Sequence, residues 1–149
     1  MDKNLKKELE SLISEELNNI SKLQSELTDC IGNSNFIRRA KGSILHDFYN
    51  ACERVFELIS REIDGGINAG EQWHKKLLYQ MTIKINDTRP PVITKKLAAE
   101  LDEYLAFRYL FRNIYGFELE GERLDRLVEK FPAAVSLFLS EIDSFLKQL

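Results

Sequence analysis

Apolar residues recur at steps of mostly three or four positions along the start of the chain, with charged residues between them. Because an α-helix turns by about 100° per residue, this spacing collects the apolar side chains on one face. The pattern predicts one long helix over residues 3–31, and the polar run at 32–35 predicts its end. The apolar positions are Leu5, Leu9, Leu12, Leu17, Ile20, Leu23 and Leu27.

A broader apolar stripe over residues 35–64 predicts a second helix that is buried on more than one side. The stripe consists of Ile37, Ala40, Ile44, Phe48, Cys52, Val55 and Ile59, and it is widened by Phe36, Leu45, Ala51 and Phe56. The glycine-containing segment 64–70 predicts the clearest break in the chain. Beyond it the apolar spacing predicts a third helix over 71–86. A rigid loop is expected over 86–91, since Pro90 disfavours helix at the residue before it.

The last part of the chain predicts further helices and no strand, because no segment alternates between apolar and polar residues for long enough. Thr94 is suited to cap a fourth helix that runs to about Tyr115, and Gly116 is suited to end it. A short helical piece near 121–129 and a final helix over 131–148 complete the chain. Pro132 is expected in the first turn of that final helix.

Together these elements predict an all-α fold, an up-and-down helical bundle of about five helices. A length of 149 residues fits a single domain over residues 1–149. The long helix within residues 1–33 suggests the hypothesis that part of it packs on a second subunit.

Charge and cysteine content narrow the classes of function. The net charge of −3 arises in residues 1–33, which hold four lysines against seven acidic residues, while the remainder is balanced. DNA binding is therefore not expected, and any RNA contact requires a local patch of positive charge.

No apolar run approaches the roughly 20 residues of a membrane span. Cys30 and Cys52 lie far apart and outside any metal-binding spacing, so we expect reduced thiols, no metal and a cytoplasmic protein.

The fourth predicted helix carries an arginine in line with its apolar face. Arg108 falls within roughly 40° of residues that a bundle would bury, and Arg112 and Tyr115 follow one and two turns later. An unpaired buried charge is costly, so Arg108 needs a partner or a ligand. Two interpretations stay open. Arg108 forms an ion pair with Glu53 or Glu57, or it converges with Arg112 and Tyr115 on a phosphate or nucleotide.

The segment 107–116 resembles the motif R-x4-H-x-Y of the HepT-like family. Arg108 matches the motif arginine, Tyr115 matches its tyrosine, and Asn113 stands where the family has histidine. The segments 45–49, 71–74 and 117–119 also resemble a HepT-like subgroup, and the resemblance extends over residues 35–149.

This resemblance implies a homodimeric helical bundle that is the toxin of a type VII toxin–antitoxin pair, with a minimal nucleotidyltransferase as antitoxin. It implies a ribonuclease that needs no metal or cofactor and cuts RNA such as tRNA or mRNA. By the motif, Arg108 would bind the scissile phosphate, and Asn113 would occupy the catalytic position. Arg112, which helix geometry places beside Arg108, is a second candidate to bind the phosphate. Tyr115 would receive AMP from the antitoxin.

Asparagine at position 113 changes that expectation, because it can form hydrogen bonds but cannot transfer a proton near neutrality. Three outcomes stay open: an inactive relative that still binds RNA or nucleotide, another histidine in the catalytic role, or a non-catalytic module that only binds a nucleotidyltransferase. We expect His46 to pack beside Tyr49 and a backbone carbonyl, out of reach of orientation by Asp47. His74 is expected to be exposed or interfacial.

Charged clusters elsewhere are expected to be ordinary solvated helix faces. The acidic cluster has the carboxylate chemistry of a divalent-metal site, and the basic clusters have the charge to touch an RNA backbone. Both kinds of cluster are common on soluble helices. The acidic cluster is Glu100, Asp102 and Glu103, and the basic ones are Arg38, Arg39 and Lys41, then Lys75 and Lys76, then Lys95 and Lys96.

Overall fold

The computed structural model describes residues 1–67, 70–113 and 121–149, and it confirms the all-α prediction. Tyr115 and Gly116 lie outside the described residues, as does the side chain of Asn113. One isolated antiparallel bridge, between Ile85 and Arg89, is the only extended pairing in the described parts. The helices are α1 (Lys3–Asp29), α2 (Asn35–Glu62), α3 (Trp73–Gln80), α4 (Lys95–Asn113) and α5 (Gly121–Lys147).

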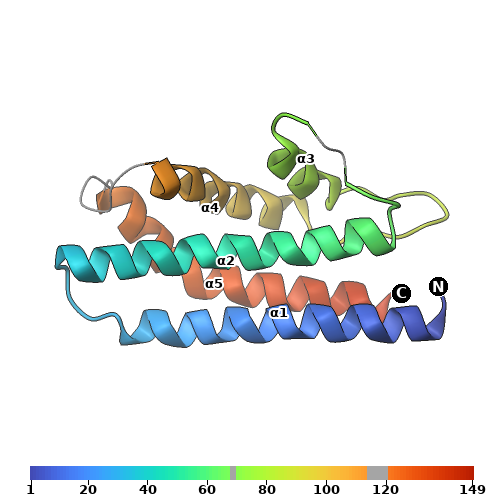
Figure 1. Ribbon diagram of the computed structural model, residues 1–149, viewed down its shortest axis with the longest axis horizontal. Helices are drawn as coiled ribbons and strands as arrows, with labels where there is room; N and C mark the ends of the chain where they lie inside the picture. Colours follow the sequence, from blue (N-terminus) through green and yellow to red (C-terminus); the bar gives the residue numbers. More distant parts are fainter. Residues whose placement is uncertain (68–69, 114–120) are drawn as a thin grey trace.

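The four long helices lie side by side and alternate in direction, so that both chain termini are at the same end of the bundle (Figure 1). The helix α2 is central, because it packs against α1, α4 and α5. The short helix α3 lies outside this bundle and packs on α2 and α4. The predicted up-and-down bundle is therefore confirmed, with α3 as an addition on one side.

Aromatic side chains of α2 occupy the centre of the core, as the broad apolar stripe predicts. The Phe48 ring packs edge-to-face against Phe131 of α5 and Tyr104 of α4, with centroids 5.0 Å and 5.2 Å away. Two details of the predicted stripes are wrong. Phe36 is 78% exposed because it lies in the first turn of α2, beyond the end of the packed region. Along α1 the core side chain is Ile13, and its neighbour Leu12 faces outward.

The third helix ends earlier than the apolar spacing predicts. The α-helix stops at Gln80, because the Met81 carbonyl accepts hydrogen bonds from the Val92 and Ile93 amides, at 2.8 Å and 3.1 Å. The intervening chain folds back on itself around Arg89. The Arg89 guanidinium reaches the Asp64 carboxylate at 2.6 Å and 2.8 Å, and it also donates to the Ile83 carbonyl at 2.9 Å. Long-range hydrogen bonds therefore override the local helical pattern over 81–86.

The final two helical pieces form one continuous helix, so the prediction of a helix start at Pro132 is wrong. Pro132 lies inside α5 on its exposed side. One buried stripe runs past it without interruption and holds both halves of the helix on the bundle. This stripe consists of Leu124, Leu127, Phe131, Ala134, Val135, Phe138, Ile142 and Phe145.

Replacing Pro132 with alanine is expected to raise the free energy of unfolding by about 1 to 3 kcal/mol, because it restores a helical hydrogen bond that proline cannot donate. Chemical denaturation of the two proteins measures the difference. The matched control is Ala133→Gly at the adjacent exposed position, which should lower stability by about 1 kcal/mol. Unchanged stability in Pro132→Ala would contradict an interior position, since proline in a first turn loses no hydrogen bond.

The two cysteines are free thiols, as the sequence predicts. Cys52 is fully buried in α2, and this burial raises the pKa of its thiol well above the ordinary value. Within the described ranges no helix is both long and apolar enough to span a membrane.

Candidate functional site

Arg108 lies on the buried face of α4 and reaches across to α2. Its Nη1 donates to the Asn50 Oδ1 at 2.8 Å and to the Glu53 Oε1 at 3.2 Å. The side chains of Arg108 and Glu53 are only 6% and 7% exposed, so this is a buried ion pair. Of the two partners that the sequence analysis considered, Glu53 is the one used. Glu57 instead pairs with Arg61 along α2.

His74 of α3 joins Arg108, Asn50 and Glu53, and these four side chains form the Arg108 cluster. The His74 Nδ1 lies 2.8 Å and 2.9 Å from the two carboxylate oxygens of Glu53, and the Arg108 Nη2 is 2.9 Å from the same Nδ1. A carboxylate that is paired with a guanidinium only accepts hydrogen bonds. The Arg108 guanidinium can only donate, so it competes with the two Glu53 oxygens for Nδ1. Two short contacts to a buried carboxylate, against one to the guanidinium, favour the tautomer in which Nδ1–H donates to Glu53 and the lone pair lies on Nε2. In that tautomer the Arg108 Nη2 touches Nδ1 without a hydrogen bond to it.

The tyrosine Tyr49 lies beneath this cluster. The Arg108 Cζ is 5.1 Å from the centre of the Tyr49 ring, within cation–π range. Burial raises the pKa of the Tyr49 hydroxyl well above the ordinary value, and the nearby Glu53 carboxylate raises it further. The hydroxyl has no hydrogen-bond partner among the described residues. Tyr49 therefore supports the guanidinium as a neutral ring.

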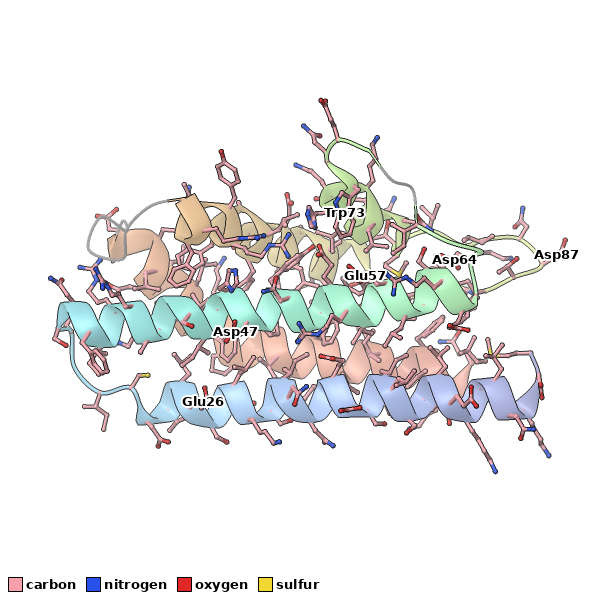
Figure 2. The ribbon with its side chains drawn as sticks, viewed as in Figure 1. Glu26, Asp47, Glu57, Asp64, Trp73 and Asp87 are labelled. Carbon is pink, nitrogen blue, oxygen red and sulfur yellow. The ribbon has the colours of Figure 1, made fainter. Side chains whose placement is uncertain are left out.

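The cluster opens on a surface cleft of about 710 Å³ between α3 and α4. Figure 2 shows Trp73, the first residue of α3, above the half of α2 that carries Glu57. Arg112 lies on the exposed side of α4, one turn after Arg108, and Lys75 pairs with Asp102 at 3.7 Å. Cations therefore outnumber anions in this cleft. Its lining residues are Gln72, His74, Lys75, Asp102, Leu105, Ala106, Arg108, Tyr109 and Arg112.

The structure brings together some of the residues that the sequence singled out. Arg108 and Arg112 both line the cleft. Asn113 is the last residue of α4, so the backbone places it one residue beyond Arg112, and its side chain is not described. Tyr115 is outside the described residues, so its convergence with the two arginines stays a prediction.

The expectation that Asp47 cannot orient His46 needs correction. The His46 Nδ1 lies 3.3 Å from the Asp47 carboxylate and 3.4 Å from the Asn50 Nδ2, with the ring 5.4 Å from that of Phe111. The Asp47 carboxylate thus does reach His46. His74, which was expected to be exposed or interfacial, is half-buried and contacts Glu53 of α2. Sequence reasoning missed Glu53 as part of a site.

One signal in the sequence could have found Glu53. It follows Tyr49 by one helical turn and precedes Phe56 by three residues, so an acid stands among side chains that the bundle buries. A buried acid without a partner is costly, and this predicts a cation or a histidine facing it.

The acidic cluster on α4 behaves as a solvated face. Glu103 pairs with Arg126 at 3.8 Å and with Lys130 at 3.3 Å, and all three side chains are more than a third exposed. In the part of the chain that the structure describes, no three His, Cys, Asp or Glu side chains converge as metal ligands.

Comparisons with known proteins place these residues in a family. Curated proteins and solved structures gave no match. A family model described as HepT-like protein matches residues 40–149, which include Glu53, His74 and Arg108. That match covers most of the chain, so this protein belongs to the HepT-like family.

Proposed function

We propose that this chain is the toxin component of a toxin–antitoxin pair whose antitoxin is a minimal nucleotidyltransferase, and that its cleft binds and cuts RNA without a metal. Membership of the HepT-like family suggests a toxin at the level of the family. The finer proposal includes a homodimer in the cytoplasm and Tyr115 as the residue to which the antitoxin transfers AMP.

The observation that carries the proposal is the arginine pair in the cleft. Arg108 is held in one position by Asn50 and Glu53, and Arg112 follows one turn later on the side of α4 that borders the cleft. Guanidinium groups match phosphate oxygens in shape and charge. Arg112 lies on the exposed side of α4 and lines the cleft, where a guanidinium can meet a phosphodiester.

Removing the Arg112 side chain tests the RNA-binding part of the proposal. Arg112→Ala is expected to weaken binding of single-stranded RNA several-fold and to lower the slope of log affinity against log salt by about 0.7, the value for one phosphate contact. Fluorescence anisotropy over a salt series with labelled RNA measures both quantities. Cleavage is tested separately by incubating the protein with total tRNA in the presence of EDTA and separating the RNA on a gel.

The matched control is Arg61→Ala. Arg61 is an exposed arginine at the end of α2, 62% exposed and paired only loosely with Glu57 at 3.6 Å. This variant removes the same charge outside the cleft and should leave the salt slope unchanged. Equal losses of RNA affinity and of salt slope in the two variants would refute a phosphate site at Arg112. If the wild type binds no RNA, the alternative is favoured, in which Asn113 marks a non-catalytic module that binds a nucleotidyltransferase.

A further inference from the structure

The Glu53–His74 pair has the arrangement of an activated base. We propose that the Nε2 of His74 is the proton acceptor for RNA cleavage in this cleft, with Glu53 as the residue that positions it. This inference rests on the proposed function and deepens it, since it assigns the proton transfer that Asn113 cannot perform.

The hydrogen bond to Glu53 fixes which nitrogen of His74 is free. The carboxylate accepts from Nδ1 at 2.8 Å, and no group among the described residues bonds to Nε2. The side chain of His74 is 34% exposed and lines the cleft, whereas that of Glu53 is 7% exposed. A buried carboxylate behind a half-exposed imidazole holds the tautomer and orients the ring.

Three helices hold this histidine in place. Glu53 comes from α2, Arg108 from α4 and His74 from the start of α3. The rings of Trp73 and His74 lie with their centroids 3.7 Å apart, which restricts rotation of the imidazole. Arg108 bonds Glu53 through Nη1 at 3.2 Å and lies in the wall of the same cleft, so the acceptor of the proton and a cation for the phosphate are neighbours.

His46 lacks these features and provides a matched comparison. Its ring packs against Phe111, its side chain is 19% exposed, and it does not line the cleft. The carboxylate of its neighbour Asp47 is more than half exposed, so it is a solvated partner rather than a buried one.

The step that we assign needs no further reactant. Nε2 takes the proton of a ribose 2′-hydroxyl, and the 2′-oxygen forms a bond to the adjacent phosphorus. The bond between phosphorus and the 5′-oxygen of the next nucleotide breaks, and that oxygen takes a proton from water. The products are a 2′,3′-cyclic phosphate and a 5′-hydroxyl, and His74 returns its proton to the solvent. Arg108 and Arg112 face the negative charge that develops on the phosphate.

The test compares His74→Ala with His46→Ala on single-stranded RNA in EDTA. His74→Ala is expected to lower the single-turnover cleavage rate by 10²- to 10⁴-fold, the usual contribution of a general base. His46→Ala should change the rate by less than about threefold. Added imidazole should restore cleavage by His74→Ala alone, because it enters the space that the side chain leaves; a purely structural role would give no such rescue. The cut ends should carry 2′,3′-cyclic phosphate.

Other outcomes separate this inference from the proposed function. Unchanged cleavage by His74→Ala would overturn the inference and leave the ribonuclease in place. Cleavage by Asn113→His but not by the wild type would also overturn it, and would mark an RNA site that has lost its base. RNA binding without cleavage by any variant would overturn both the inference and the nuclease proposal. RNA affinity and the thermal unfolding midpoint of His74→Ala are measured alongside, and both should match the wild type.

Discussion

Replacing Asp64 with alanine is expected to lower the free energy of unfolding by about 3 to 5 kcal/mol, because it leaves a buried guanidinium without its counter-charge. The side chains of Arg89 and Asp64 are 0% and 2% exposed, and two hydrogen bonds of 2.6 Å and 2.8 Å join them. Water cannot reach Arg89 to compensate. Urea denaturation, with the midpoint and slope compared between variants, measures the loss.

A more exposed ion pair near the end of α2, between Glu57 and Arg61, supplies the control. Glu57→Ala removes a carboxylate from the partly exposed pair with Arg61 and should cost no more than about 1 kcal/mol. If Asp64→Ala lowers the free energy of unfolding as little as Glu57→Ala does, the hydrogen bonds from Arg89 to carbonyl groups are sufficient to stabilise the buried guanidinium. The Asp64 carboxylate would then contribute little to stability.

This ion pair also bears on the candidate site. Asp64 accepts a hydrogen bond from the Gln80 side chain at 2.9 Å, and Arg89 donates to the Gln80 carbonyl at 3.3 Å. The first contact joins the end of α3 to the chain just after α2, and the second joins it to the loop that holds Arg89. Figure 2 shows Asp64 beside the loop that carries Asp87. Because α3 carries His74, loss of the pair would also loosen the histidine of the cleft.

The second large loss of stability is expected on replacement of Glu53. Glu53→Leu should lower the free energy of unfolding by about 3 to 5 kcal/mol, since Arg108 would stay buried with only the neutral side chains of Asn50 and His74 beside its guanidinium. The double variant Glu53→Leu, Arg108→Met removes both charges. It should recover most of that loss, to within about 1 to 2 kcal/mol of the wild type, because well-packed apolar side chains can replace a buried ion pair.

This comparison, again by urea denaturation, shows what the pair contributes. A double variant as unstable as Glu53→Leu alone would contradict the expected relief of an uncompensated charge. A double variant that is stable but fails to bind RNA would indicate that the buried charges are retained for the cleft rather than for the fold.

Much of the bundle follows from local pattern. The spacing of apolar residues determined that α1, α2 and α4 exist and roughly where they begin and end, because burial of one helix face repeats every three or four residues. Thr94 was identified as a cap, and its Oγ1 accepts from the Leu97 amide at 3.1 Å. The arginine on the apolar face of α4 was also visible, since a charge among buried positions breaks a regular pattern.

The sequence could not predict what depends on contacts between distant segments. Helix α3 ends early because of Arg89 and Asp64, which are 25 residues apart, and α5 continues through Pro132 because one buried stripe holds both halves. The sequence left Glu53 and Glu57 as alternative partners of Arg108, and it did not predict the contact of Glu53 with His74, for the same reason. Along the sequence, Glu53 is 21 residues from His74 and 55 residues from Arg108, and the helical repeat of one chain segment does not predict contacts over such separations.

The sequence by itself therefore determined the all-α class, the helical bundle and the resemblance to the HepT-like family. Only the tertiary structure placed His74 against a buried carboxylate at the edge of a cleft. The physical reason is that the spacing of apolar residues predicts which face of a helix is buried. Which side chain of a neighbouring helix faces that position depends on the register and crossing of the packed helices, and these are set by the whole core.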